Sequence, residues 1–426
     1  MGNPAWRREI AAGATTFLAM AYIVVVNPAI LSKSGMPSED VFFATCIASA
    51  IGTFLMAFLA RYPFALAPGM GLNAFFAFTV CGAMGIPWQT GLAAVLLSGI
   101  LFLLLSVFGL RTRVVEALPA DLIRAIAAGI GLFIAFIGLE NGEIIIDHPA
   151  TLVTLGDLTS PTAAVTAVGL LLTIALVAAR VPGAILIGII ATAALAFATG
   201  IAPPPQTLLK IPRLPTETFG KAFGALPDLF TPTLLPVLFT MLFLDLFDTM
   251  GTLFALGHAT GQVDAKGRLP RADKAFASDA AATIVGSILG TSTVTTYIES
   301  AAGIAVGGRT FRTAVVVGIL FIVALPLFPL VAATPAFATA PALIVVGALM
   351  FGEAARIDWN NRAVAPAALA TILFMPATYN ISNGIGAGFV LYVVAHLAGR
   401  RFASLNPVIC AIASLFVIYF VFRPGG

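Results

Sequence analysis

Long apolar segments with almost no charge follow one another along most of this 426-residue chain, and they decide what it can fold into. Examples are Ala93 to Val107, Ala163 to Ala179 and Ala314 to Leu325. A bilayer core is about 30 Å thick, and a helix needs about 20 apolar residues to cross it. Only 10% of the residues are charged, against roughly 25% in an ordinary soluble domain. The sequence therefore excludes a soluble enzyme, a nucleic-acid-binding domain and a disordered chain.

The length of the segments favours an all-α polytopic membrane protein over a barrel. Outer-membrane strands are segments of about 10 residues with alternating polarity, whereas these runs are longer and continuously apolar. Several runs are short or interrupted, so we predict about 14 transmembrane spans, with residues 363–422 as the least regular part. The run from Ile10 to Leu31 is too long for a typical signal peptide, and we expect it to remain as the first span.

Positive charges predict the orientation, because cytoplasmic loops carry an excess of Lys and Arg. If the N-terminus is cytoplasmic, 17 of the 22 Lys and Arg residues lie on the cytoplasmic side and five do not. The five are Lys33, Lys210, Arg213, Lys221 and Arg423. One false span would invert every later loop, so this asymmetry also supports the span assignment. We expect an integral protein of a bacterial-type inner (plasma) membrane.

A Pro-rich stretch divides the chain into two halves. We interpret residues 201–232 as an external linker between residues 1–200 and residues 233–426, each predicted to hold seven spans. An odd number of spans per half inserts the second copy upside down, which is the inverted-repeat design of many secondary transporters. Gly99-Ile-Leu-Phe recurs as Gly318-Ile-Leu-Phe, and this short identity gives weak direct support for two copies.

Two spans at corresponding places in the halves are interrupted. Phe64–Asn73 carries a proline and two glycines within an apolar run, and Gly290–Glu299 is β-branched and polar before a helical pattern resumes. Lipid cannot satisfy free backbone groups, so such a break must face protein or water, and matching breaks are the best sequence indication of a transport site. Ordinary kinks or loops are the alternative. The residues that we expect to form the breaks are Gly69, Gly71, Thr296 and Ile298.

Three carboxylates are predicted to lie inside the membrane. Asp245 and Asp248 are spaced i, i+3 on one face of the eighth span, and Glu299 follows the second break. An ionisable group at the bilayer centre costs roughly 2.5–3.5 kcal/mol on insertion scales, which argues for a function. Two close carboxylates at low dielectric cannot both ionise cheaply, so we expect at least one to hold a proton. The alternatives are structural hydrogen bonds for the aspartates and a helix N-terminal role for Glu299; Asp279 is expected at a membrane interface.

Five motifs resemble the AzgA-like purine permeases of the nucleobase–cation symporter 2 (nucleobase–ascorbate transporter) superfamily. The motifs are Thr16–Pro28, Ala65–Phe76, Phe243–Thr252, Gly290–Ile304 and Met375–Gly384. The resemblance implies two inverted seven-span repeats divided into a core domain and a gate domain, with short strands interrupting spans 3 and 10. It implies a core near residues 10–109 plus 233–331 and a gate near residues 119–200 plus 337–422. One departure is Phe311-Arg312, where the family usually has Gly after the motif that ends at Thr310.

The resemblance also assigns roles to individual residues. It implies that Asp245 and Glu299 bind the purine, that Asn73 is a polar substrate residue in span 3, and that Tyr297 can stack near the base. It associates Asp248 with transport, which we interpret as proton coupling. Together with the membrane carboxylates, the resemblance implies a secondary active transporter that imports hypoxanthine, guanine or adenine by proton symport through alternating access.

The predicted transporter has no catalytic residue, no metal and no cofactor, and the proton is its coupling ion. Its expected partners are a purine nucleobase and the lipid bilayer, with a homodimer as an option and no nucleic acid. Three alternatives remain open: a carrier of the same fold for uracil, xanthine or another solute, a channel, and a membrane-embedded enzyme of the prenyltransferase type. The enzyme would use the Asp-x-x-Asp pair to hold Mg²⁺ and a diphosphate.

Overall fold

The computed structural model describes residues 4–108, 119–229, 234–263, 269–400 and 405–421. Six cations used in the orientation prediction lie outside the described residues, namely Arg111, Arg113, Lys266, Arg268, Arg401 and Arg423.

The elements of the first half of the chain are mostly helices. They are α1 (Pro4–Met20), α2 (Ile23–Leu31), the 3₁₀ turn η1 (Ser32–Ser34), α3 (Ser38–Leu55), the π-helical turn η2 (Met56–Ala60), β1 (Leu66–Pro68), α4 (Met70–Ala74), the π-helical segment η3 (Phe75–Ala83), α5 (Trp88–Val107), α7 (Ala120–Asn141), β2 (Ile145–His148), β3 (Leu152–Leu155), α8 (Pro161–Ala178) and α9 (Ala184–Ala198).

The second half repeats this helical character. Its elements are α10 (Lys221–Gly224), the 3₁₀ turn η4 (Leu226–Leu229), α11 (Leu235–Thr260), α12 (Ala272–Leu289), β4 (Val294–Thr296), α13 (Ser300–Val306), α14 (Phe311–Ala324), the 3₁₀ turn η5 (Leu325–Leu327), α15 (Phe328–Ala333), α16 (Ala336–Phe351), the 3₁₀ turn η6 (Gly352–Arg356), α17 (Val364–Ala377), α18 (Ile381–Ala398) and α19 (Pro407–Val421).

Several helix ends follow from local sequence. The Ser160 hydroxyl accepts a hydrogen bond from the first turn of α8, and the Asn380 side chain caps α18 in the same way. Gly261, Gly290 and Gly307 end α11, α12 and α13 with positive φ angles of 69°, 106° and 108°. Glycine adopts this left-handed conformation without the steric cost that a Cβ atom would bring.

Nine helices in the described ranges are long and apolar enough to cross a membrane by length and composition. Four shorter apolar helices add to them, at Met70–Ala83, Ala184–Ala198, Val364–Ala377 and Pro407–Val421. Large apolar side chains such as Leu171 and Ile190 are more than half exposed, as expected for a protein whose outer surface faces lipid. The fold is therefore that of a helical polytopic membrane protein.

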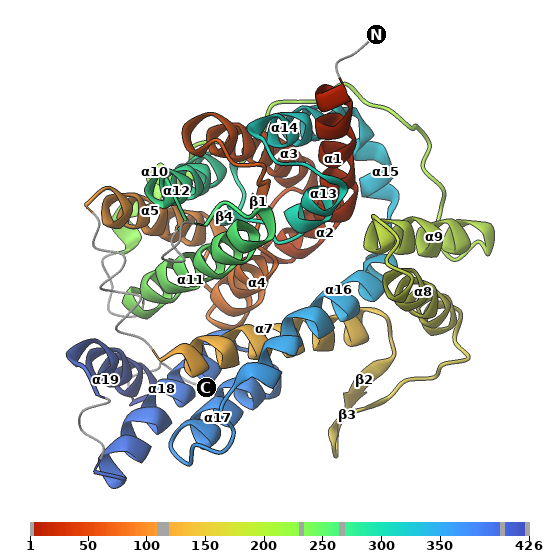
Figure 1. The fold of residues 1–426 in the computed structure, drawn as a ribbon. Coiled ribbons are helices and arrows are strands. Elements are labelled where there is room, and N and C mark those ends of the chain that lie inside the picture. Colours follow the sequence, from red (N-terminus) through yellow and green to blue (C-terminus); the bar gives the residue numbers. More distant parts are fainter. Residues whose placement is uncertain (1–3, 109–118, 230–233, 264–268, 401–404, 422–426) are drawn as a thin grey trace.

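The helices form two groups, each built from both halves of the chain (Figure 1). The first group contains α1–α5 and α10–α15, with β1 and β4 in its middle; α12 packs on α3 and α5, and α14 packs on α1 and α3. The second group contains α7–α9 and α16–α19, and α7 packs on α16 and α17. The groups meet where α4 contacts α7, α2 contacts α16 and η3 contacts α18.

The strands β1 and β4 come from the two interrupted spans and pair with each other. They are antiparallel, with Leu66 opposite Thr296, Ala67 opposite Thr295 and Pro68 opposite Val294. All six residues are buried. A two-stranded sheet at this place satisfies backbone groups that the interrupted helices leave open, as a lipid-surrounded chain requires.

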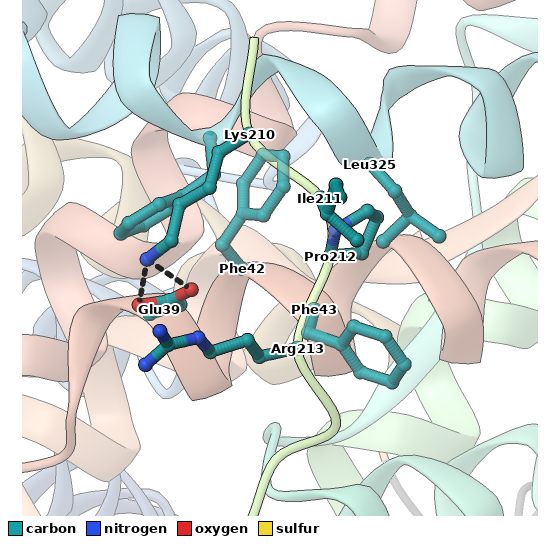
Figure 2. A pocket seen from close by; sticks show the side chains of 9 residues that line it. Glu39, Phe42, Phe43, Lys210, Ile211, Pro212, Arg213 and Leu325 are labelled. Atoms are coloured by element: carbon teal, nitrogen blue, oxygen red, sulfur yellow. Dashed lines mark hydrogen bonds and ion pairs between the residues drawn. The ribbon is translucent and has the colours of Figure 1, made fainter. Parts of the chain in front are cut away.

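The Pro-rich segment between the halves packs against the first helix group. Lys210 Nζ lies 2.7 Å from Glu39 Oε1 of α3 and forms an ion pair with it (Figure 2). The backbone N–H of Lys210 donates to the carbonyl of Pro326 at 2.9 Å. The Asp40 carboxylate of α3 accepts the N–H of Thr218 at 3.1 Å. The segment is therefore a strap across the first group, and the small hollow drawn in Figure 2 lies on this strap, away from the membrane carboxylates.

A hairpin of β2 and β3 connects α7 to α8. Its register pairs Ile145 with Leu155 and His148 with Leu152. The signal was present, because two short β-branched runs flank a turn at Pro149 and Ala150.

Candidate functional site

The crossing of β1 and β4 is held by hydrogen bonds that extend beyond the strands. The N–H of Gly69 donates to the carbonyl of Thr293 at 3.0 Å, and the N–H of Tyr297 donates to the carbonyl of Ala65 at 2.9 Å. In an antiparallel pair alternate residues point their N–H and C=O groups away from the partner strand, here Leu66 and Pro68 of β1 and Val294 and Thr296 of β4. These outward groups need other partners, since they are buried.

A threonine hydroxyl from the preceding helix satisfies the outward groups of each strand. Thr53 of α3 accepts the N–H of Leu66 at 2.9 Å and donates to the Leu66 carbonyl at 3.2 Å. Thr283 of α12 accepts the N–H of Val294 at 3.2 Å and donates to the Val294 carbonyl at 3.0 Å. The same solution occurs once in each half of the chain.

Thr296, the last residue of β4, needs a hydrogen-bond acceptor that Pro68, the last residue of β1, does not need. Pro68 has no N–H to satisfy, whereas Thr296 has an N–H and a hydroxyl. Both are hydrogen bonded to Asp279 of α12, with the Thr296 hydroxyl 2.8 Å from Asp279 Oδ1. Asp279 Oδ2 accepts the hydroxyl of Thr249 on α11 at 2.7 Å. Asp279 therefore joins α11, α12 and β4.

The expectation for Asp279 did not include this structural role. Its side chain is fully buried, and it lies two turns inside α12, which begins at Ala272. The hydropathy of the run placed Asp279 near the predicted end of a span, and hydropathy alone gives no information about β4. The available signal was a carboxylate within an otherwise small and apolar helical run.

The two aspartates of α11 have different surroundings although they are three residues apart. Asp245 is fully buried; its Oδ2 accepts the hydroxyl of Thr283 at 3.4 Å, and its Oδ1 has no hydrogen-bond partner among the described residues. Asp248 is exposed, and it accepts a hydrogen bond from the Thr295 side chain of β4. Asp245 thus points towards α12, and Asp248 points towards the crossing.

The exposure of α11 changes along one helix face at Asp248. Towards the C-terminus, Gly251 and Ala255 continue the exposed face, whereas towards the N-terminus Met241 and Val237 are buried. These positions lie on the same face because they are three, four or seven residues apart. The exposed face of α11 therefore begins at Asp248 and continues along the C-terminal half of the helix.

Glu299 lies on the same side of the crossing as Asp248. It caps the N-terminus of α13, and its side chain is half-buried. Its Oε1 accepts the hydroxyl of Tyr22 at 2.7 Å. Glu299 and Asp248 lie close enough to interact electrostatically. The structure therefore brings together two of the three carboxylates predicted from the sequence on its accessible side, with Asp245 behind them.

Asn73 and Tyr297 hold the interrupted segments to each other. Asn73 is fully buried in α4; its Oδ1 accepts the Ser292 hydroxyl, and its Nδ2 has no partner among the described residues. Tyr297 is 5% exposed, and its hydroxyl donates to the Pro68 carbonyl at 2.5 Å. Both side chains thus lie at the crossing and connect β1 or α4 to the segment that contains β4.

The remaining predicted break residues lie around the same crossing. Gly69 is buried against Thr295, and Thr296 is buried against Asp279. A Cβ atom on Gly71 would lie 2.9 Å from Cγ2 of Ile130 on α7, so this glycine allows the two helix groups to approach each other. Ile298 is 50% exposed, next to Glu299.

The arrangement combines charge, hydrogen-bond acceptors and an apolar frame. Asp248 and Glu299 can accept N–H groups of a planar polar solute, and ionised acceptors form the stronger hydrogen bonds. A third carboxylate, Asp245, is buried one helical turn from Asp248, and its Oδ1 has no hydrogen-bond partner among the described residues. Such a site offers hydrogen-bond acceptors for the N–H groups of a solute and carboxylates that can take up a proton.

Comparison with known proteins agrees with this chemistry. A model described as the Permease family matches residues 7–387. The chain is 42% identical over 427 residues to the guanine/hypoxanthine permease PbuG of Bacillus subtilis, covering 98% of this chain and 97% of that protein. It is 39% identical over 423 residues to the adenine permease AdeP of Escherichia coli, covering 98% and 93%. These matches confirm the purine-permease resemblance, and with it a transporter rather than an enzyme.

The solved structures add a likeness in fold alone. The transmembrane domain of a cyanobacterial bicarbonate transporter, BicA, matches with a TM-score of 0.61 at 15% identity, covering 93% of this chain and 98% of that chain.

Proposed function

We propose a specific transport function for this chain, which belongs to the Permease family whose model it matches. It imports purine nucleobases, namely hypoxanthine and guanine or adenine, through an inner membrane by proton symport. In this proposal the chain has 14 spans in two inverted repeats and a cytoplasmic N-terminus. The first helix group is the core that carries the site, and the second group is the gate against which it moves.

The observation that carries the proposal is the pairing of Asp248 and Glu299 beside the β1–β4 crossing. A purine presents several N–H donors along its edges, and two carboxylates at the end of an aqueous path can accept them. The relatives PbuG and AdeP are named for guanine, hypoxanthine and adenine. In this proposal, with a cytoplasmic N-terminus, the exposed half of α11 leads from Asp248 towards the cytoplasm and lines the aqueous path to the site.

The exposure of the aspartates favours an exchange of the roles predicted from the sequence. That prediction gave Asp245 to the base and Asp248 to the proton. Asp248 is exposed beside Glu299, whereas Asp245 is fully buried and has an unpartnered oxygen among the described residues. We therefore assign base contact to Asp248 and Glu299, and proton storage to Asp245. Asp248→Asn should weaken purine binding, and Asp245→Asn should bind purine yet fail to accumulate it.

Coupling follows from the cost of unpaired charge in the membrane. Moving the core past the gate with several ionised carboxylates would be expensive. A proton that neutralises one of them, together with a base that covers another, lowers this barrier. Purine and proton then favour the same occluded state, so each tightens the binding of the other by the same factor.

The test is uptake of labelled hypoxanthine into proteoliposomes that contain the purified protein. An imposed inward proton gradient without sodium should drive accumulation, and a protonophore should abolish it. Uptake should fall as the external pH rises from about 6 to about 8, since the coupled proton becomes scarcer. Accumulation driven by sodium alone would overturn proton symport, and competition by uracil but not by adenine, guanine or xanthine would overturn the purine assignment.

A further inference from the structure

Tyr22 is a buried tyrosine at the junction of α1 and α2, and the proposed transport cycle gives it no role. Its side chain is 2% exposed. The hydroxyl donates to Glu299 Oε1 at 2.7 Å, across 277 residues of sequence. Tyr22 also lies within electrostatic reach of Tyr297 and Asp248, so it faces the proposed site and not the outer surface.

The hydrogen bond from Tyr22 uses one oxygen of the Glu299 carboxylate and leaves the other for the solute. A carboxylate has two acceptor oxygens with about four lone-pair positions. Tyr22 occupies Oε1, and the backbone N–H of Glu299 also donates to the carboxylate; Oε2 accepts no side-chain hydrogen bond from the described residues. The side chain of a glutamate has several rotatable bonds, and a fixed orientation removes an entropy cost that binding would otherwise carry.

The fold keeps this pair together. Tyr22 is the N-cap residue of α2, and the N–H of Val26 donates to the Tyr22 carbonyl at 2.9 Å, which fixes the backbone of the junction. Glu299 is the N-cap residue of α13, and α1 packs directly on α13 within the first helix group. Both residues therefore belong to one group, and a movement between the two groups leaves their contact in place.

We propose that Tyr22 is a positioning residue that holds Glu299 so that Oε2 faces the purine. This inference rests on the proposed function, because it gives Glu299 a base to bind. Tyr22 itself does not contact the solute in this proposal. Its hydroxyl acts only through Glu299, which separates the proposal from a general packing role for the ring.

A double-mutant cycle tests the inference by binding of labelled hypoxanthine to the purified full-length protein. Tyr22→Phe should raise the Kd about tenfold, since one hydrogen bond to a charged group is lost. In a Glu299→Gln background the same change should raise the Kd less than about threefold, because contacting residues are not additive. The matched control is Tyr419→Phe, which removes a buried hydroxyl that has no hydrogen-bond partner among the described residues. It should leave the Kd within about twofold.

The outcomes separate this inference from the proposed function. Wild-type protein that binds no purine would overturn both. A wild type that binds, with equal losses for Tyr22→Phe in both Glu299 backgrounds or no loss in either, would overturn the positioning role alone. If Tyr22→Phe does not fold, Tyr22→His replaces it, because histidine keeps a ring N–H donor. We expect its Kd within about threefold of wild type, and a tenfold rise that is equal in both backgrounds would again overturn the role.

Discussion

The segments around β1 and β4 face each other across the middle of the first helix group, and each follows its preceding helix in the same way. The Thr53 hydroxyl forms hydrogen bonds with the outward N–H and C=O groups of Leu66, and the Thr283 hydroxyl does the same for Val294. In each half, a threonine of the preceding helix thus satisfies backbone groups that the interrupted helix leaves without partners. This correspondence is better evidence for two related halves than any short sequence identity.

The side chains of the two segments differ. Leu66, Ala67 and Pro68 are apolar, whereas β4 continues from two threonines into Tyr297 and Glu299. Asn73 after β1 is fully buried, but Glu299 after β4 is half-buried beside the exposed Asp248. In the proposed function, the segment around β1 therefore supplies a scaffold, and the segment around β4 supplies the groups that bind the purine. Substitutions around β4 should change binding more than substitutions around β1.

The largest effect is expected for Glu299→Ala. It removes the carboxylate that accepts Tyr22 and, in the proposed function, the base, so hypoxanthine affinity should fall by about 100-fold or more. Glu299→Gln keeps one acceptor and should be intermediate. Equilibrium binding to purified protein measures both, and size-exclusion chromatography verifies folding. An affinity equal to that of wild type in Glu299→Ala would remove the functional distinction between the segments.

Asp279→Ala should produce the largest loss of stability. It leaves the Thr296 N–H, the Thr296 hydroxyl and the Thr249 hydroxyl without their acceptor in a buried place. Each such group costs about 1–3 kcal/mol, and relaxation reduces the sum, so we expect about 3 kcal/mol. Asp279→Asn keeps one acceptor oxygen and should lose less. Thermal unfolding of the solubilised protein provides the measurement, and equal melting temperatures for Asp279→Ala and wild type would contradict the role.

The twin variants Thr53→Val and Thr283→Val test the symmetry of the two segments directly. Each removes the partner of one N–H and one C=O, so both should destabilise the protein by a similar amount of about 1–2 kcal/mol. Only Thr283 also donates to Asp245. We therefore expect Thr283→Val, and not Thr53→Val, to change proton-driven accumulation in proteoliposomes. A change in accumulation for Thr53→Val but not for Thr283→Val would mean that the segment around β1, and not the segment around β4, takes part in coupling.

The smallest effect on affinity is expected for Asn73→Ala. Its Oδ1 has Ser292 as a partner, and the side chain is fully buried, so its influence on the solute is indirect. We expect a loss of about threefold to tenfold in hypoxanthine binding, with Asn73→Asp as the matched variant that keeps the acceptor. A loss as large as that of Glu299→Ala would place Asn73 in direct contact with the base and weaken the distinction between the two segments.

Local sequence was sufficient for the features that depend on composition and on backbone chemistry. The apolar runs predicted a helical membrane protein. Pro68, Gly69 and Gly71 indicated a break in one of these runs, and the structure has β1 at that place. The cost of charge in lipid was enough to single out Asp245, Asp248 and Glu299 among the acidic residues. Each of these predictions rests on a free energy that is set by the residue itself and its few neighbours in the chain.

The tertiary structure decided which groups face each other. Hydropathy gave Asp245 and Asp248 the same environment, yet packing of α12 buries one and leaves the other open. Asp279 gained its role from Thr296 and Thr249, which no local pattern connects to it. Tyr22 meets Glu299 across 277 residues. Hydropathy is a sum over neighbours in sequence, whereas a hydrogen bond or an accessible surface depends on elements that only the fold brings together.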